Sequence, residues 1–125
     1  MWDVALVGAG NLGKAIADYA GFVGKGFVIS AIFDNDPAKI GKEMGIHNVI
    51  VQDVSELADT IRQRAIEVGI IATPAEAAQE VARTMVEAGI KAILNYAPIT
   101  LIVPASVRGQ YIDPVVGLQR MTYYL

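Results

Sequence analysis

The sequence predicts an α/β domain in which helices cover both faces of a mainly parallel sheet. Apolar, β-branched runs alternate along the chain with segments whose apolar residues recur at helical spacing. The strand-like runs are continuously apolar, which is typical of strands that are buried on both faces. A glycine-rich turn joins the first run to the first helical segment. Together these observations indicate a Rossmann-like, doubly wound sheet in residues 1–113, followed by an apolar helix in residues 114–125.

The first half of the chain carries three predicted strands, the third of them weak, over residues 3–7, 27–33 and 48–51. A helix over residues 11–22 opens directly from the glycine-rich turn. Asp36-Pro37 predicts the start of a second helix, because proline is accepted at the first helical position. That helix must be short, since Gly41 follows it closely.

The second half of the chain repeats the alternation. Asp53 or Ser55 can cap a helix that carries apolar residues at near-helical spacing. A further helix starts at Thr73-Pro74 and stops at Gly89. The remaining apolar runs predict two strands and, between two prolines, a short edge strand, over residues 68–72, 91–95 and 99–103.

Length and composition indicate a single domain with part of its surface covered. At 125 residues the chain can bury one core, but it is too short for a nucleotide fold plus a separate catalytic domain. It is 54% hydrophobic and only 18% charged, although a small domain has a large surface that needs polar cover. We therefore expect a partner to cover some of that surface.

The C-terminal segment, residues 114–125, has the sequence PVVGLQRMTYYL and predicts a helix with scarcely a polar face. Such a helix has to be buried, either against the sheet of its own chain or in a second subunit. The high hydrophobic fraction favours the second alternative. We therefore expect a homodimer in which this helix is exchanged.

Charge and residue types exclude several classes of function. A net charge of −3 and a pI near 5.0 give this chain no basic surface for nucleic acid. It has no cysteine, which excludes disulfides and thiolate-held metals. No run reaches the roughly 18 apolar residues of a membrane span, and no basic flank marks a secretory signal. We expect a cytoplasmic protein with no membrane partner.

One turn matches the pattern G-x-G-x-x-G, and it consists of Gly8, Ala9, Gly10, Asn11, Leu12 and Gly13. The pattern is weak alone, but here it follows a predicted buried strand, opens a helix and precedes an acidic residue after the second strand, Asp34. Gly8 permits the tight turn, Gly10 lets a pyrophosphate approach the backbone, and Gly13 lets the helix pack on the strand. The helix N-terminus then attracts the phosphates.

Asp34 is expected to accept hydrogen bonds from the hydroxyls of an adenosine ribose. Its charge would repel a 2′-phosphate, which favours NADH and NAD⁺ over their phosphorylated forms. The alternative is a glycine-rich turn that binds no ligand.

The loops after the fourth and fifth predicted strands face the same cofactor, because ligands bind outside the carboxyl ends of parallel strands. Their small and rigid residues suit a wall against a flat ring, and the candidates are Thr73, Pro74, Asn95, Ala97 and Pro98. Ordinary turn chemistry explains the same residues about as well.

The sequence offers no convincing catalytic group, so we expect a protein that is not an enzyme. The single histidine, His47, lies in a turn before the weak third strand and is a poor general base. Tyr19 lacks a lysine partner in a recognisable motif. No metal site, Ser-His-Asp set or carboxylate pair can be assembled.

Five segments, in order and spacing, resemble the cofactor-binding domain of the redox-sensing transcriptional repressors called Rex. They are GAGNLGKAIADYAGF, FDNDPAKIG, TPAEAAQEVA, AGIKAILNYAP and YIDPVVGLQRMTYYL, and they extend over essentially the entire chain. The resemblance implies competitive binding of NADH and NAD⁺ within a homodimer that binds operator DNA when NADH is scarce.

By this resemblance, the glycine turn holds the pyrophosphate and Asp34 the ribose. Tyr19 matches a tyrosine near the nicotinamide, Asp113 matches an aspartate of the redox-dependent switch, and residues 114–125 match the exchanged helix. Asn95 and Pro98 match an N-[FY]-A-P stretch that lines the pocket. Rex repressors also carry an N-terminal winged-helix domain, whereas this chain begins at its first strand. Operator DNA is therefore expected as a partner only through a domain absent here.

Two other functions share this architecture. The first is a CoA-binding domain like that of the succinyl-CoA ligase α subunit, against which Asp34 argues because a carboxylate repels the 3′-phosphate of CoA. The second is the nucleotide half of a small NAD-dependent reductase, for which residues 99–125 are too few to form the second domain.

Overall fold

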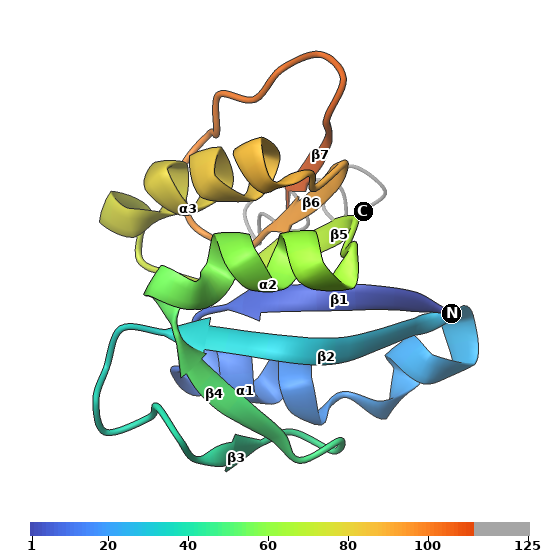
Figure 1. The fold of residues 1–125 in the computed structure, drawn as a ribbon, viewed down its shortest axis with the longest axis vertical. Helices are drawn as coiled ribbons and strands as arrows, with labels where there is room; N and C mark the ends of the chain where they lie inside the picture. The colour runs from blue at the N-terminus through green and yellow to red at the C-terminus, as the bar shows by residue number, and fades with distance from the viewer. Residues whose placement is uncertain (112–125) are drawn as a thin grey trace, which may run out of the picture.

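The computed structural model describes residues 1–111, which form one seven-stranded sheet with helices on both faces (Figure 1). The strands are β1 (Trp2–Val7), β2 (Phe27–Asp34), β3 (Glu43–Met44), β4 (Val49–Asp53), β5 (Val68–Ile71), β6 (Ala92–Asn95) and β7 (Arg108–Tyr111). The helices are α1 (Asn11–Asp18), α2 (Leu57–Arg64) and α3 (Ala75–Ala88), with 3₁₀ turns η1 (Ala20–Lys25) and η2 (Val54–Glu56).

The strand order is β3-β4-β2-β1-β5-β6-β7, and every neighbouring pair is parallel except the antiparallel pair β3 and β4. Chain order reverses at β1, because β2 lies on one side of it and β5 on the other. This topology confirms the predicted Rossmann-like, doubly wound and mainly parallel fold. It also places the switch point, where such sheets bind ligands, beyond the end of β1.

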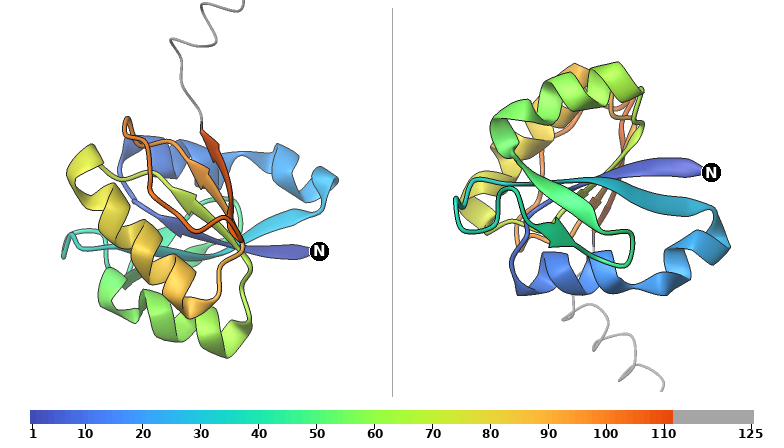
Figure 2. Two further views of the ribbon diagram at one scale, coloured as in Figure 1. Left: turned by 90° about the horizontal axis from the view of Figure 1, so that it is seen from above. Right: turned by 60° about the horizontal axis from the view of Figure 1, so that its bottom comes forward.

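Helices α2 and α3 cover one face of the sheet, and α1 with η1 covers part of the other (Figure 2). Leu57 and Ile61 of α2 and Met85 of α3 are buried against β1, β2 and β5. On the opposite face, Ile16 and Ala17 of α1 pack against β1, β2 and β4. Burial on both faces explains why the strands are continuously apolar.

Helix α3 shows how local signals set an element. Its apolar residues Ala78, Val81, Ala82 and Met85 recur at spacings of three and four, so they share one face and are buried. Pro74 precedes the helix, and Gly89 ends it in the left-handed conformation at φ 115°. The prediction of this helix from sequence is confirmed.

The predicted helix over residues 11–22 is wrong in its second half. Helix α1 ends at Asp18, and Tyr19 adopts extended backbone before the 3₁₀ turn η1. The turn contains Gly21 and Gly24, and glycine is a poor helix former. The ring of Tyr19 also lies where a side chain at Gly21 would project.

Two further expectations differ from the structure, and one strand was not predicted. Residues 99–103 lie in a loop, and the strand beside β6 is instead β7, whose sequence RGQY carries little strand propensity. The predicted helix after Asp36 is a hydrogen-bonded turn that ends at Gly41, with φ 88°. The antiparallel β3 had no clear sequence signal. Asp113 and the predicted helix over residues 114–125 lie outside the described residues.

Replacing Gly13 with alanine is expected to destabilise the fold by about 3 kcal/mol, because the new Cβ would collide with the backbone carbonyl of Gly8. Urea unfolding measures this change. Gly10→Ala is the matched control, since a Cβ there meets no atom within 4 Å; its effect is expected to stay within about 1 kcal/mol. Equal losses in the two variants would contradict the close packing of α1 on β1.

Candidate functional site

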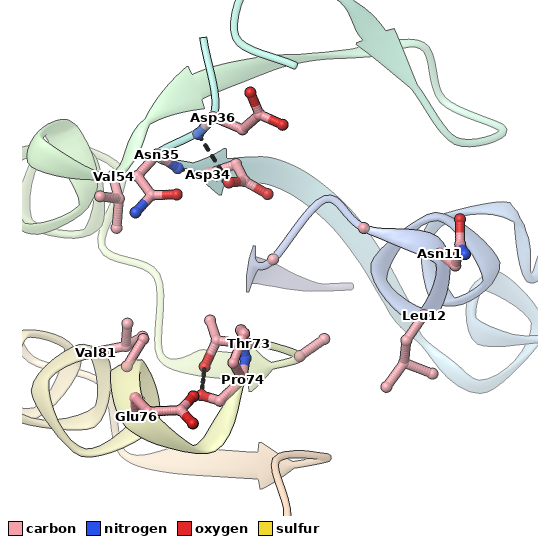
Figure 3. Close-up of a pocket in the computed structure, with 14 residues that line it drawn as sticks. Asn11, Leu12, Asp34, Asn35, Asp36, Val54, Thr73, Pro74, Glu76 and Val81 are labelled. Carbon is pink, nitrogen blue, oxygen red and sulfur yellow. Dashed lines mark hydrogen bonds between the residues drawn. The ribbon is translucent and has the colours of Figure 1, made fainter. Parts of the chain in front are cut away.

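A cavity of about 650 Å³ lies at the carboxyl ends of β1, β2 and β5 (Figure 3). We call it the glycine-turn pocket. Among the site residues predicted from sequence, those that line it are Gly8, Gly10, Asn11, Leu12, Asp34, Thr73 and Pro74. The topological switch point therefore coincides with a real cavity.

Each glycine of the turn has a different geometric role. Gly8 has φ 114°, a conformation that favours glycine, and a Cβ there would strike the carbonyl group of Ala72. Gly13 contacts the backbone of Gly8, which draws α1 against the end of β1. A Cβ at Gly10 would meet no atom within 4 Å, and Gly10 lines the pocket. A ligand can therefore approach its backbone directly.

Helix α1 begins at this turn and points its N-terminus at the pocket. The residue before the helix, Gly10, supplies no side-chain cap, and the first hydrogen bond of the helix runs from the Lys14 N–H to the Gly10 carbonyl at 2.9 Å. The N–H groups of the first turn therefore have no intrahelical acceptor. With the positive end of the helix dipole, they form an anion site.

The carboxylate of Asp34 connects the end of β2 to the glycine turn. One oxygen accepts a hydrogen bond from the Ala9 N–H at 2.7 Å. The other accepts from the N–H groups of Asn35 at 2.7 Å and Asp36 at 3.0 Å. Three of roughly four lone-pair positions are thus engaged, which fixes the carboxylate at the rim of the pocket.

The pocket is also lined by residues that the sequence analysis missed. Val54 from η2 and Ala77 and Val81 from α3 supply an apolar surface, with Val54 and Val81 visible in Figure 3. Asn35, Asp36 and Glu76 add polar groups. Ala77 and Val81 are four residues apart, so they share a strip along α3, at the edge of the buried face to which Val81 belongs. That spacing could have pointed to them once the pocket was placed at the start of α3.

Three predicted site residues lie in the next loop and do not line the glycine-turn pocket. Asn95 ends β6 and pairs in register with Ile71 of β5. Its side chain is 1% exposed and bonds to backbone groups of Ala97 and Ile99. Pro98 follows at the surface. These residues form a turn immediately beyond the β5 side of the pocket.

Tyr19 does not lie in the glycine-turn pocket either. Its side chain is 59% exposed, and its ring meets that of Phe22 edge to face at 5.0 Å. Both residues line a second cavity of about 600 Å³ on the α1 side of the sheet. We call this cavity the apolar groove. Its floor is formed by side chains of β1, β2, β5 and β6, among them Ile29, Ile70 and Leu94.

Residues 1–111 contain neither a metal-binding cluster nor a membrane-spanning helix. In that range, no group of three or more histidine, cysteine, aspartate or glutamate side chains could hold a metal ion. His47 is exposed in the turn between β3 and β4. No helix within the described part of the chain is both long and apolar enough to cross a membrane.

The fold and the pocket define a nucleotide-binding domain of the Rossmann type. The family model described as CoA binding domain matches residues 1–99, so the chain belongs to that family. Within it, the chain is a domain of the Rex type. The redox-sensing transcriptional repressor Rex of Chloroflexus aurantiacus is 54% identical over 124 residues, which cover 99% of this chain and 58% of the relative.

Solved structures of a Rex-family repressor, RSP, agree with this assignment. RSP in complex with β-NADH has a TM-score of 0.90 and 38% identity, over 98% of this chain and 59% of RSP. RSP in complex with β-NAD⁺ and operator DNA has a TM-score of 0.88 and 39% identity, over 98% and 56%. The present chain thus spans a little over half the length of these relatives.

Proposed function

We propose that this chain is the NAD(H)-binding regulatory domain of a redox-sensing transcriptional repressor. The observation that carries the proposal is Asp34, which is fixed at the end of β2 on the rim of the pocket formed by the glycine turn. A carboxylate in this position is the usual ribose ligand of NAD-binding domains. The RSP complex with β-NADH supports the same ligand.

The residues present suit a dinucleotide. The open backbone at Gly10 and the free N–H groups at the start of α1 would hold the pyrophosphate. Asp34 would accept from the adenosine ribose, and Val54 and Val81 would contact the adenine. The second half of the ligand would then extend past Thr73 toward the end of β6. When bound, the cofactor supplies a ring whose charge differs between NADH and NAD⁺.

The pocket favours the unphosphorylated cofactor. Among residues 1–111, Asp34, Asp36 and Glu76 line it, whereas no lysine or arginine does. A 2′-phosphate would be repelled and would meet no cation in that lining. Within the described part of the chain, the same lining contains no histidine, lysine or tyrosine that could move a proton in a hydride-transfer reaction. We therefore propose sensing of the NADH/NAD⁺ ratio in the cytoplasm rather than catalysis.

We also propose that operator DNA is bound by a winged-helix domain in the parent protein, outside the present chain. The chain covers only 58% of the Chloroflexus relative, and its own net charge is −3. An acidic domain is poorly suited to the phosphate backbone. The regulatory domain would control DNA binding through the ratio of the two cofactor forms, with Asp113 acting in the switch.

We further propose that the chain forms a homodimer through residues 114–125. This segment is nearly all apolar, and it follows β7, whose Arg108 and Gln110 line the apolar groove. Tyr19, which follows α1, is exposed at this groove, beside the apolar side chains Ile29, Ile70 and Leu94 of its floor. Exchange of the segment between two subunits would cover both apolar surfaces.

CoA binding is the second candidate, because the matching family is described as a CoA binding domain. CoA carries a 3′-phosphate on its adenosine ribose, next to the position proposed for Asp34. NADH and CoA therefore differ at the ribose end of the pocket, where CoA would bring the negative charge of its 3′-phosphate and NADH would bring only hydroxyl groups.

Calorimetric titration of the chain with NADH, NAD⁺, NADPH and CoA in parallel tests the proposed function. We expect NADH to bind most tightly, NAD⁺ to compete with it, and incubation with NADH to leave the cofactor unchanged. NADPH and CoA are expected to bind more weakly because the acidic rim opposes their ribose phosphates. Tight binding of CoA with no affinity for NADH would establish the second candidate instead.

Replacing Asp34 with alanine is expected to weaken NADH binding by about 1–3 kcal/mol, since the ribose hydroxyls lose their acceptor. Calorimetry gives the affinity, and thermal unfolding of the ligand-free variant reports any loss from the Ala9 contact. Asp53→Ala is the control, because that carboxylate accepts from the Ser55 N–H in a similar turn outside the pocket. Unchanged NADH affinity in Asp34→Ala would refute the ribose assignment.

Replacing Leu118 with aspartate is expected to convert the dimer to monomers, because a charge in an apolar interface lacks a partner. Light scattering measures the mass in solution. Gln119→Asp introduces the same charge one residue away, at a position that is already polar, and is expected to remain dimeric. A wild-type monomer, or identical masses for the two variants, would contradict assembly through this segment.

A further inference from the structure

The connection between β6 and β7 is unusual because it joins two parallel neighbours without a helix. Residues 96–107 form it as irregular backbone, although such crossovers normally contain a helix that satisfies its own polar groups. Leu101 and Ala97 of this loop are nevertheless buried in the core. Backbone N–H and C=O groups near them need other hydrogen-bond partners.

Asn95 supplies those partners at the start of the loop. Its Nδ2 donates to the carbonyl oxygens of Ala97 at 3.3 Å and Ile99 at 2.9 Å, and its Oδ1 accepts from the Ala97 N–H at 2.9 Å. Both donor hydrogens of the amide can thus be used within four residues of chain. The side chain is buried and committed to its own backbone, so it is not available to a ligand.

The turn that Asn95 holds lies next to the glycine-turn pocket. The Tyr96 N–H donates to the Ile71 carbonyl at 2.8 Å, and Ala72, the residue after Ile71, lines the pocket. Across the sheet, the neighbouring strands are β2, β1, β5 and β6 in that order. Asp34 lies at the end of β2, the glycine turn follows β1, and the turn held by Asn95 follows β6. A dinucleotide held by Asp34 and the glycine turn would reach the end of β6 with its second half.

We infer that Asn95 is a positioning residue for the half of the ligand beyond the pyrophosphate. It acts without touching the ligand, by fixing the backbone of residues 96–99 as a wall at the end of β6. The inference rests on the proposed function, since it concerns the same ligand. It assigns to Asn95 a role different from the pocket lining expected from sequence.

Gln79 provides an internal comparison. Its side-chain amide bonds to both backbone groups of Ile102, donating to the carbonyl at 2.9 Å and accepting from the N–H at 2.8 Å. It therefore fastens the same loop to α3, but at a point beyond the turn. Loss of Gln79 is expected to loosen the loop without moving the wall.

The test compares NADH with ADP-ribose, which lacks the nicotinamide. Asn95→Asp keeps the oxygen that accepts from the Ala97 N–H. It replaces the donating Nδ2 by an oxygen, which faces the carbonyl oxygens of Ala97 and Ile99 without a hydrogen to share. We expect its NADH affinity to fall by about tenfold while its affinity for ADP-ribose changes by less than about twofold. Gln79→Ala is expected to lower the melting temperature and to leave both affinities within about twofold. Equal loss of both ligands in Asn95→Asp, or no loss of NADH, would overturn the inference.

Pro98→Gly provides a variant that keeps the core intact. Pro98 is exposed, and glycine there frees the backbone of the wall. The same selective loss of NADH is expected, and unchanged NADH affinity would count against a positioning role for the turn. Failure of the wild-type chain to bind either ligand would instead refute the proposed function, so the two failures are distinguishable.

Discussion

The close contact between Gly13 and the backbone of Gly8 is the constraint on which the rest of the site depends. A side chain at Gly13 would separate α1 from the end of β1, and a side chain at Gly8 would strike the backbone of Ala72 beyond β5. Because the two segments touch, the N-terminus of α1 faces the space beyond β1 and β5, and the turn between them exposes backbone rather than side chains. The pocket is therefore a direct result of helix packing.

Asp34 adds a second constraint, which links two segments that are distant in sequence. Its bond to the Ala9 N–H joins the end of β2 to the glycine turn, and its bonds to Asn35 and Asp36 shape the following loop. One carboxylate thus stabilises both loops and sets the charge of the rim. A substitution at Asp34 changes the shape and the electrostatics of the pocket together, which is why the Asp53 comparison is informative.

The sequence predicted those elements whose signals are local. The central strands, the glycine turn and α3 each carry their pattern within a few residues, and the pocket residues of the glycine turn and of β2 were identified. Strand β7 was missed because it is held by pairing with β6 rather than by its own composition. Val54 and Val81 were missed because only the tertiary fold brings them to the same pocket as Asp34. The end of α1 before Tyr19 depends on two glycines and on a ring contact.

The hairpin of β3 and β4 affects how the domain behaves in concentrated solution. An open sheet edge can recruit strands from other molecules and so lead to aggregation. Here the edge strand contains only Glu43 and Met44, runs antiparallel to its neighbour, and is bounded by the bend at Gly45 with φ 80°. Glu43 within the strand and Lys42 just before it carry opposite charges. This edge therefore offers too short and too polar a template for growth of the sheet, which protects the domain from edge-to-edge polymerisation.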